Sequence, residues 1–108
     1  MPLDLPTPIS NYFAAKNAHD VDAMLSAFSD DASVRDEGRD MIGRGAIREW
    51  MDETTRKYRV TATPSGVAHA DGRTIVTAQV SGSFPGSPAE LHYRFTIAGE
   101  KIAKLEIH

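Results

Sequence analysis

The segment that decides the fold of this chain runs from Asn17 to Met51 and reads NAHDVDAMLSAFSDDASVRDEGRDMIGRGAIREWM. Its pattern predicts a short helix, a strand that ends in a carboxylate, a turn and another helix. Within the strand, Ala32, Val34 and Asp36 share one parity, and alternate residues of a strand point to the same face. We therefore expect Asp36 to face the interior together with the two apolar residues.

Three helices are predicted around this strand. An apolar stripe before the segment indicates a first helix that is capped by Thr7 and ends near Ala18. Asp20 suits the cap of a shorter helix, whose single apolar face extends as far as Phe28. The helix that follows the two glycines near residue 44 has a similar stripe and is complete by Tyr58.

The remainder of the chain predicts an antiparallel sheet. β-forming residues dominate segments 58–69, 74–84, 91–97 and 101–108. Pro64-Ser65-Gly66 predicts an edge, a bulge or a turn, and Asp71-Gly72 is a hairpin signal. Helices followed by a meander of strands are typical of an α+β fold in which the helices cover one face of a curved sheet.

Composition excludes several classes of function. A chain of 108 residues with 41% hydrophobic residues predicts one domain. A net charge of -3 argues against nucleic acid as a partner, and the lack of cysteine excludes disulfides and thiolate metal sites. The histidines are scattered without ligand spacing, so we expect no metal and no cofactor. No apolar run approaches a membrane span and no signal peptide is evident, which predicts a cytoplasmic protein that does not contact membranes.

The face of the sheet that points away from the helices is predicted to be polar. It carries Thr77, Gln79, Ser81, His92, Arg94 and Thr96. These residues suit either water or a second subunit, and we expect a homodimer through this face.

Three segments of the chain resemble the nuclear transport factor 2-like superfamily, in particular its SnoaL-like polyketide cyclases and ketosteroid isomerases. They are residues 12–20, residues 28–36 and residues 43–50, which read YFAAKNAHD, FSDDASVRD and GRGAIREW. The resemblance implies one SnoaL-like domain over residues 1–108, and Pro2, Pro6 and Pro8 predict that residues 1–6 form an extended arm. It also implies a cone-shaped roll, in which three N-terminal helices pack in a curved antiparallel sheet that encloses an apolar pocket, and a dimer.

The resemblance also implies roles for particular residues. The general base of the isomerases matches Asp36, and their oxyanion-holding tyrosine matches Tyr12. Their second oxyanion donor falls on Leu91, and a supporting tyrosine falls on Met51. The cyclases use an aspartate on a later strand, whereas no aspartate follows Asp71 here.

These positions suggest acid/base chemistry at Asp36. Removing a proton next to a carbonyl needs a base near the carbon and a donor near the oxygen. An apolar pocket wall would raise the pKa of Asp36 and make it a stronger base. The alternatives are that Asp36 caps the following turn or pairs with Arg35, Arg39 or Arg44, and that Tyr12 only packs in the core.

The sequence therefore predicts a protein that binds a small apolar molecule, and an isomerase-like or cyclase-like enzyme with Asp36 as base and Tyr12 as donor. The residues predicted to form the core or the substrate-binding wall are Phe28, Trp50, Met51, Phe84, Leu91, Tyr93 and Leu105. A non-catalytic ligand-binding module and a dimeric interaction domain are the alternative functions.

Overall fold

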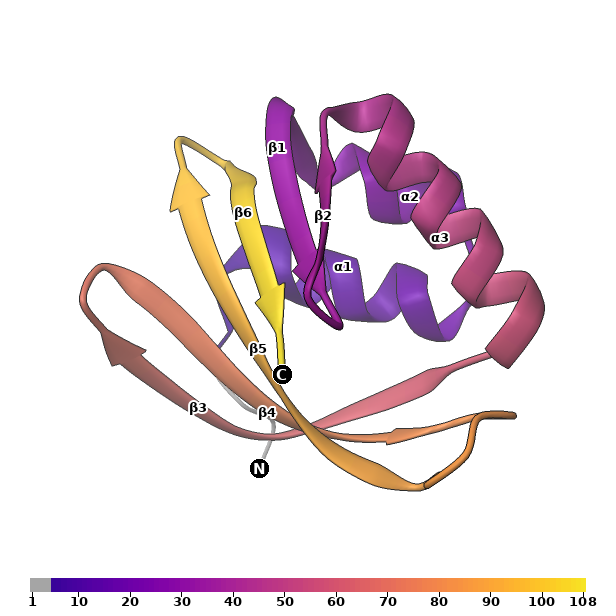
Figure 1. Cartoon of the computed structure of the whole chain (residues 1–108). Coiled ribbons are helices and arrows are strands. Elements are labelled where there is room, and N and C mark those ends of the chain that lie inside the picture. The colour runs from indigo at the N-terminus through magenta and orange to yellow at the C-terminus, as the bar shows by residue number, and fades with distance from the viewer. Residues whose placement is uncertain (1–4) are drawn as a thin grey trace.

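Residues 5–108, which the computed structural model describes, form three helices and one curved six-stranded sheet, with the helices on one face of the sheet (Figure 1). This arrangement confirms the predicted α+β class. The proposed N-terminal arm, residues 1–6, lies mostly outside the described residues. Within residues 5–108, no helix is both long and apolar enough to cross a membrane.

The helices are α1 (Thr7–Asn17), α2 (Val21–Ser26) and α3 (Arg44–Tyr58). Asp20 caps α2 as predicted, because the Ala23 N–H donates to its Oδ1 at 3.1 Å. The predicted cap of α1 is wrong: Pro6 occupies the cap position without a side-chain hydrogen bond, and Thr7 is already helical. A proline in this place leaves no side-chain acceptor but has the extended backbone that precedes a helix.

The strands are β1 (Phe28–Asp36), β2 (Arg39–Ile42), β3 (Thr61–Ala70), β4 (Arg73–Ser81), β5 (Ala89–Ala98) and β6 (Lys101–Ile107). Their order in the sheet is β2-β1-β6-β5-β4-β3. The sheet is mixed rather than wholly antiparallel, because β1 and β6 pair in parallel. Parallel neighbours need a long connection between them, and here almost the whole remaining chain provides it.

Several strands differ from the prediction: β4 ends at Ser81 and not at residue 84, so Phe84 lies in the following loop, and β5 begins at Ala89 and not at residue 91. β1 begins at Phe28 and not near Ala32, because the Ile102 N–H donates to the Ala27 carbonyl at 2.8 Å and joins this part of the chain to β6. Phe28 is therefore a strand residue and not the end of α2. β3 is continuous through Pro64, with a register shift between Pro64 and Gly66 at the edge of the sheet. The predicted edge and bulge are both present.

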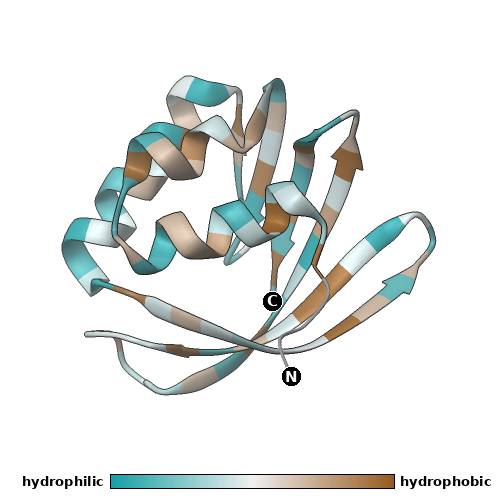
Figure 2. Cartoon of the chain, turned by 180° about the vertical axis from the view of Figure 1, so that it is seen from behind, coloured by the Kyte–Doolittle hydropathy of each residue, from teal (hydrophilic) through white to brown (hydrophobic). Residues whose placement is uncertain are grey.

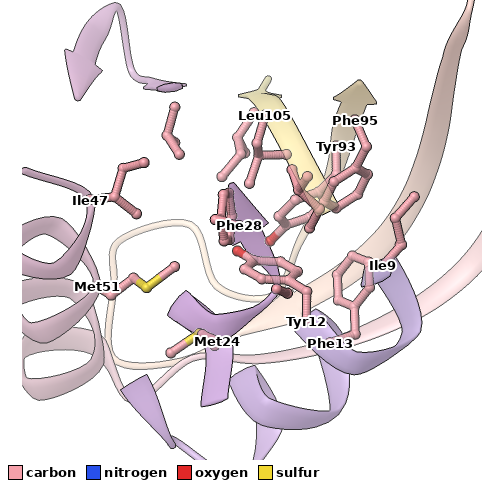
Figure 3. Close-up of a cluster of buried hydrophobic side chains, with 14 of the residues drawn as sticks. Ile9, Tyr12, Phe13, Met24, Phe28, Ile47, Met51, Tyr93, Phe95 and Leu105 are labelled. Carbon is pink, nitrogen blue, oxygen red and sulfur yellow. The ribbon is translucent and has the colours of Figure 1, made fainter. Parts of the chain in front are cut away.

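The core lies between the helices and the inner face of the sheet. Ala32 and Val34 are buried, as are Val76, Ala78 and Val80 on β4, which confirms the predicted alternation. Figure 2 shows the same alternation of apolar and polar residues along the strands. The centre of the core is aromatic, and Figure 3 shows Tyr12 and Phe13 of α1 meeting Phe28, Tyr93 and Phe95 of the sheet.

The end of α1 is tied to the start of β3. The Asn17 side chain donates from Nδ2 to the Ala62 carbonyl at 2.8 Å and accepts from the Ala62 N–H at 2.7 Å. His19 Nε2 lies 3.1 Å from the Val60 carbonyl oxygen. The Asn-Ala-His-Asp motif therefore has a structural role, because it fixes the position of the helix end relative to the sheet.

The outer face of the sheet is polar, as predicted. Gln79, Ser81, His92 and Arg94 are exposed there. Thr77 Oγ1 and His92 Nδ1 lie 3.1 Å apart across two strands. The homodimer through this face stays a prediction, which sedimentation of the purified protein would test.

Candidate functional site

A pocket of about 600 Å³ opens between the last turn of α1, the side of α3 and the sheet. Its apolar wall includes Trp50, Val80, Phe84, Leu91, Tyr93 and Ile107. Its charged residues are Lys16, Asp36, Glu37, Arg39 and Glu53. This combination of an apolar wall and a few polar groups is typical of a small-molecule site.

Asp36 lies at the end of β1, where the chain enters a tight turn. Glu37 and Gly38 in this turn have φ values of 53° and 75°, and Asp36 pairs with Arg39 across the hairpin. Such a turn requires positive φ at both central residues, which glycine adopts readily. The predicted parity is confirmed, because Asp36 is partly buried on the same face as Val34 and lines the pocket.

Trp50 holds the carboxylate from α3. Its indole Nε1–H donates to Asp36 Oδ2 at 3.1 Å. This donor is neutral, so it orients one carboxylate oxygen without neutralising the charge of Asp36.

The three arginines considered as partners of Asp36 are engaged elsewhere. Arg35 pairs with Asp40 at 3.1 Å, and Arg39 lies 4.0 Å from Glu53. Arg44 donates to the Phe28 carbonyl at 2.8 Å and lies 3.8 Å from Asp30. Within residues 5–108 the ion pairs do not include Asp36.

The pKa of Asp36 is raised from its ordinary value of 3.8, chiefly by burial and also by the charge of Glu37. The Trp50 hydrogen bond and the charges of Lys16 and Arg39 oppose this rise. Burial disfavours the charged form of an acid, so the carboxylate binds a proton more tightly than a solvated one. That is the property required of a general base.

Lys16 is the site residue that the sequence did not identify. In the sequence, the stem of Lys16 completes the three-and-four spacing of the apolar stripe of α1, whereas the structure places this residue in the pocket wall with Asp36. Its Nζ lies 5.7 Å from the centre of the Tyr12 ring. Burial lowers the pKa of Lys16 from 10.5 to about 8, and the charge of Asp36 opposes this shift. A lysine within an otherwise apolar helical stripe was the available signal.

Tyr12 lies deeper than the pocket. It is fully buried, and its ring packs edge-to-face on Phe28 at 5.7 Å and on Phe95 at 5.8 Å. Its hydroxyl has no hydrogen-bond partner within the described part of the chain. Burial, and then the nearby Tyr93 and Asp36, raise the pKa of Tyr12, so this hydroxyl stays protonated.

The other predicted wall residues fall into two groups. Trp50, Phe84, Leu91 and Tyr93 line the pocket. Phe28, Met51 and Leu105 are buried in the core, with at most 1% of each exposed, and are not among the residues that line the pocket. Contact with a substrate stays a prediction for all seven.

The loop at residues 82–88 forms one side of the pocket. A Cβ at Gly82 would lie only 2.6 Å from the Tyr58 carbonyl oxygen, so glycine is required at this close approach. The neighbouring Ser83 N–H donates to the same oxygen at 2.8 Å. Phe84 then packs edge-to-face on Tyr58 at 6.1 Å, which anchors the loop to the end of α3.

Comparison with known proteins places these features in a family context. Residues 9–105 match the family model of the SnoaL-like domain. A candidate polyketide cyclase from Sinorhizobium meliloti has a similar crystal structure, with 40% identity, a TM-score of 0.92 and coverage of 97% of this chain and 96% of that chain. No protein with a curated description matches the sequence.

Two more distant structures share the fold. A protein with a ketosteroid isomerase-like fold from Catenulispora acidiphila, solved with trimethylamine, is 21% identical with a TM-score of 0.83, over 97% of this chain and 86% of that chain. The epoxide hydrolase/cyclase-like enzyme SalBIII, which has a role in pyran ring formation in the polyether salinomycin, is also 21% identical. Its TM-score is 0.78, over 94% of this chain and 86% of that chain.

Proposed function

Since the chain belongs to the SnoaL-like domain family, we propose that its pocket binds a small apolar carbonyl compound and catalyses proton transfer next to the carbonyl, with Asp36 as the general base. The observation that carries this proposal is a desolvated carboxylate in an apolar pocket, held by the Trp50 N–H at 3.1 Å and separate from the neighbouring ion pairs. A structural carboxylate would be expected to pair with one of the adjacent arginines.

The apolar part of the pocket wall suits an apolar skeleton. Leu91, Val80 and Phe84 offer no charge, and a volume of about 600 Å³ accommodates a molecule of a few fused rings. The charged groups at the pocket entrance, Arg39 and Glu53, already neutralise each other. The substrate is therefore expected to carry its polar group at the Asp36 end.

The donor to the carbonyl oxygen is proposed to be Tyr12. Its hydroxyl is buried without a partner, and an unsatisfied buried hydroxyl costs free energy unless a ligand supplies the acceptor. Tyr93 lines the pocket, and its influence on the pKa of Tyr12 indicates that the two hydroxyls are near each other, so we expect a ligand to approach the Tyr12 hydroxyl from the Tyr93 side. Both tyrosines have a raised pKa, so their hydroxyls stay protonated at neutral pH and can donate a hydrogen bond.

The comparisons support this class of chemistry for the fold. The relative with 40% identity is described as a candidate polyketide cyclase, and ring closure by cyclases requires the same removal of an acidic proton. Whether the product is an isomer or a ring depends on the substrate. The shared step is proton abstraction by Asp36.

The test is deuterium exchange into 2-tetralone, an apolar ketone with acidic α-protons, followed by NMR in D₂O. The wild type should accelerate exchange, and Asp36→Asn should lower the enzymatic rate by about 10²–10⁴-fold, the usual contribution of a general base. Asp40→Asn is the matched control, because it removes the same charge from an exposed carboxylate that pairs with Arg35. Equal exchange by the wild type and Asp36→Asn would refute the role of Asp36.

A non-catalytic binding module is the second candidate. The observation that favours it is Leu91, an apolar side chain at the position where the resemblance implies a second oxyanion donor. It would be supported if the wild type bound 2-tetralone in a fluorescence titration of Trp50 without accelerating exchange.

A further inference from the structure

We propose that Lys16 is a covalent catalyst whose Nζ forms an imine with the carbonyl carbon of the substrate, while Asp36 removes the adjacent proton. This inference rests on the proposed function, since it assigns a second reacting group to the same pocket. It also narrows the substrate class to aldehydes and ketones, because esters and amides do not form imines with an amine.

The position of Lys16 supports this role. It extends from the last turn of α1 into the pocket, where it shares the wall with Asp36 and Tyr93. Its side chain is partly buried, and its Nζ faces the Tyr12 ring at 5.7 Å. The ion pairs of residues 5–108 leave it out, so no carboxylate in the described part of the chain holds the ammonium in place.

The surroundings of Lys16 also favour the reactive form of the amine. Only the neutral amine attacks a carbonyl, and a desolvated lysine is a recognised nucleophile for this reason. Burial lowers the pKa of Lys16 to about 8 from 10.5 for a solvated lysine, which raises the neutral fraction near pH 7.5 by roughly two hundredfold. The other three lysines of the chain are Lys57, Lys101 and Lys104, and all three are exposed.

An imine would also compensate for a missing part of the site. An enolate needs donors at its oxygen, yet the pocket presents Leu91 where a second donor is expected, which leaves Tyr12 as the one proposed donor. A protonated imine accepts the electron pair of the breaking C–H bond at nitrogen and becomes a neutral enamine. The reaction then needs no oxyanion at all.

The steps balance without an additional reactant. The neutral Lys16 amine adds to the carbonyl carbon, and the resulting carbinolamine takes a proton from solvent on its hydroxyl and loses water to give the protonated imine. Asp36 takes the proton from the α-carbon as the C–H electrons form the enamine double bond. Asp36 returns its proton to carbon, and addition of water to the protonated imine releases the carbonyl compound, the neutral Lys16 amine and the proton taken from solvent.

The experiment uses benzoylacetone, a 1,3-diketone that condenses with a reactive amine to a stable enaminone with a new near-ultraviolet absorbance. The expected result is modification of Lys16 at least about tenfold faster than of the other lysines, located by peptide mass mapping. Lys16→Met and Lys16→Arg should both lose the adduct, and the arginine variant keeps the positive charge. Lys57→Met is the matched control and should keep it.

Two outcomes would overturn the inference. One is equal modification of the four lysines, and the other is an adduct in Lys16→Met at the wild-type rate. Circular dichroism of each variant shows whether it is folded. If Lys16→Met is not folded, the loss of the adduct is tested with Lys16→Arg.

The same variants distinguish this inference from the proposed function. If Lys16→Arg exchanges 2-tetralone at the wild-type rate, the covalent role fails while Asp36 remains the base. If Asp36→Asn exchanges normally while Lys16 still forms the enaminone, the proposed base fails and the amine chemistry remains.

Discussion

The packed core and the pocket are built from the same two elements, α1 and β1, and differ in which part of each element they use. Tyr12 and Val34 lie in the core, whereas Lys16 and Asp36, one helical turn and two strand residues further on, line the pocket. Both pairs share the inward face of their element. The difference is that α1 and β1 end beside the pocket. Their last inward-facing residues therefore line the pocket instead of packing against other core side chains.

This comparison explains why charges occur on inward faces. A charge in the middle of the core would need a buried partner, and desolvation of the pair would offset the attraction. At the end of a helix or strand, a side chain on the inward face is only partly removed from water. Asp36 and Lys16 keep enough access for charge, but their pKa values shift towards the neutral forms. Within residues 5–108, the Tyr12 hydroxyl is the one buried side-chain polar atom without a hydrogen-bond partner.

Removal of an aromatic ring is expected to give the largest difference in stability between the core and the pocket. Phe28→Ala should cost about 3–5 kcal/mol of unfolding free energy, because Phe28 is fully buried and the cavity cannot collapse. Phe84→Ala at the pocket wall is the matched variant and should cost far less, since its cavity is open. Urea denaturation measures both, and similar losses would mean that the pocket wall is packed like the core.

The next effect concerns the core hydroxyl. Tyr12→Phe should raise the unfolding free energy by about 1–3 kcal/mol, because it removes a buried hydroxyl that lacks a partner. If Tyr12 is also the donor, the same variant should exchange 2-tetralone more slowly. If Tyr12→Phe is more stable and exchanges 2-tetralone at the wild-type rate, Tyr12 is not the donor. If Tyr12→Phe is less stable than the wild type, the Tyr12 hydroxyl must have a hydrogen-bond partner in the folded protein.

At the pocket, Asp36→Asn should raise the melting temperature at neutral pH. The pKa of Asp36 is raised in the folded protein above its ordinary value of 3.8. Its contribution to stability is therefore complete below that value and is lost as the pH rises through the folded pKa. Asparagine carries no charge and can still accept the Trp50 N–H.

Thermal unfolding across a pH series measures this effect. The gain of Asp36→Asn over the wild type should be largest near neutrality and vanish at about pH 3. Asp40→Asn should show no such gain, since Asp40 is exposed in an ion pair. If Asp36→Asn is less stable than the wild type at pH 7, the attraction of the Asp36 charge to Lys16 and Arg39 stabilises the protein by more than the desolvation of that charge costs.

The smallest effect is expected at the pocket entrance. Arg39→Gln breaks a 4.0 Å pair with Glu53 in which both side chains are at least half exposed, so stability should change by less than about 0.5 kcal/mol. Arg39 lowers the pKa of Asp36, and its removal should move the pH dependence of exchange upwards. A loss of unfolding free energy as large as that of Phe28→Ala would mean that this ion pair stabilises the protein as much as a buried aromatic ring, which would contradict the expectation.

Local patterns in the sequence were sufficient for most of the fold. The parity that directs Asp36 inward, the Asp20 cap and the Asp71-Gly72 hairpin depend on neighbours within a few residues, and each is present. The start of β1 was not predictable in this way. Phe28 continues the helical stripe of α2, and only the hydrogen bond from Ile102 to Ala27 makes it a strand residue.

The sequence by itself determined the α+β class, the inward carboxylate and the family. Only the tertiary structure decided which groups surround that carboxylate: the Trp50 N–H from α3, Lys16 from α1 and arginines that pair elsewhere. The reason is that the face of a residue is set by the period of its own helix or strand. Its burial, its hydrogen bonds and its pKa are set by residues distant in the chain, which meet only when the sheet closes over the helices.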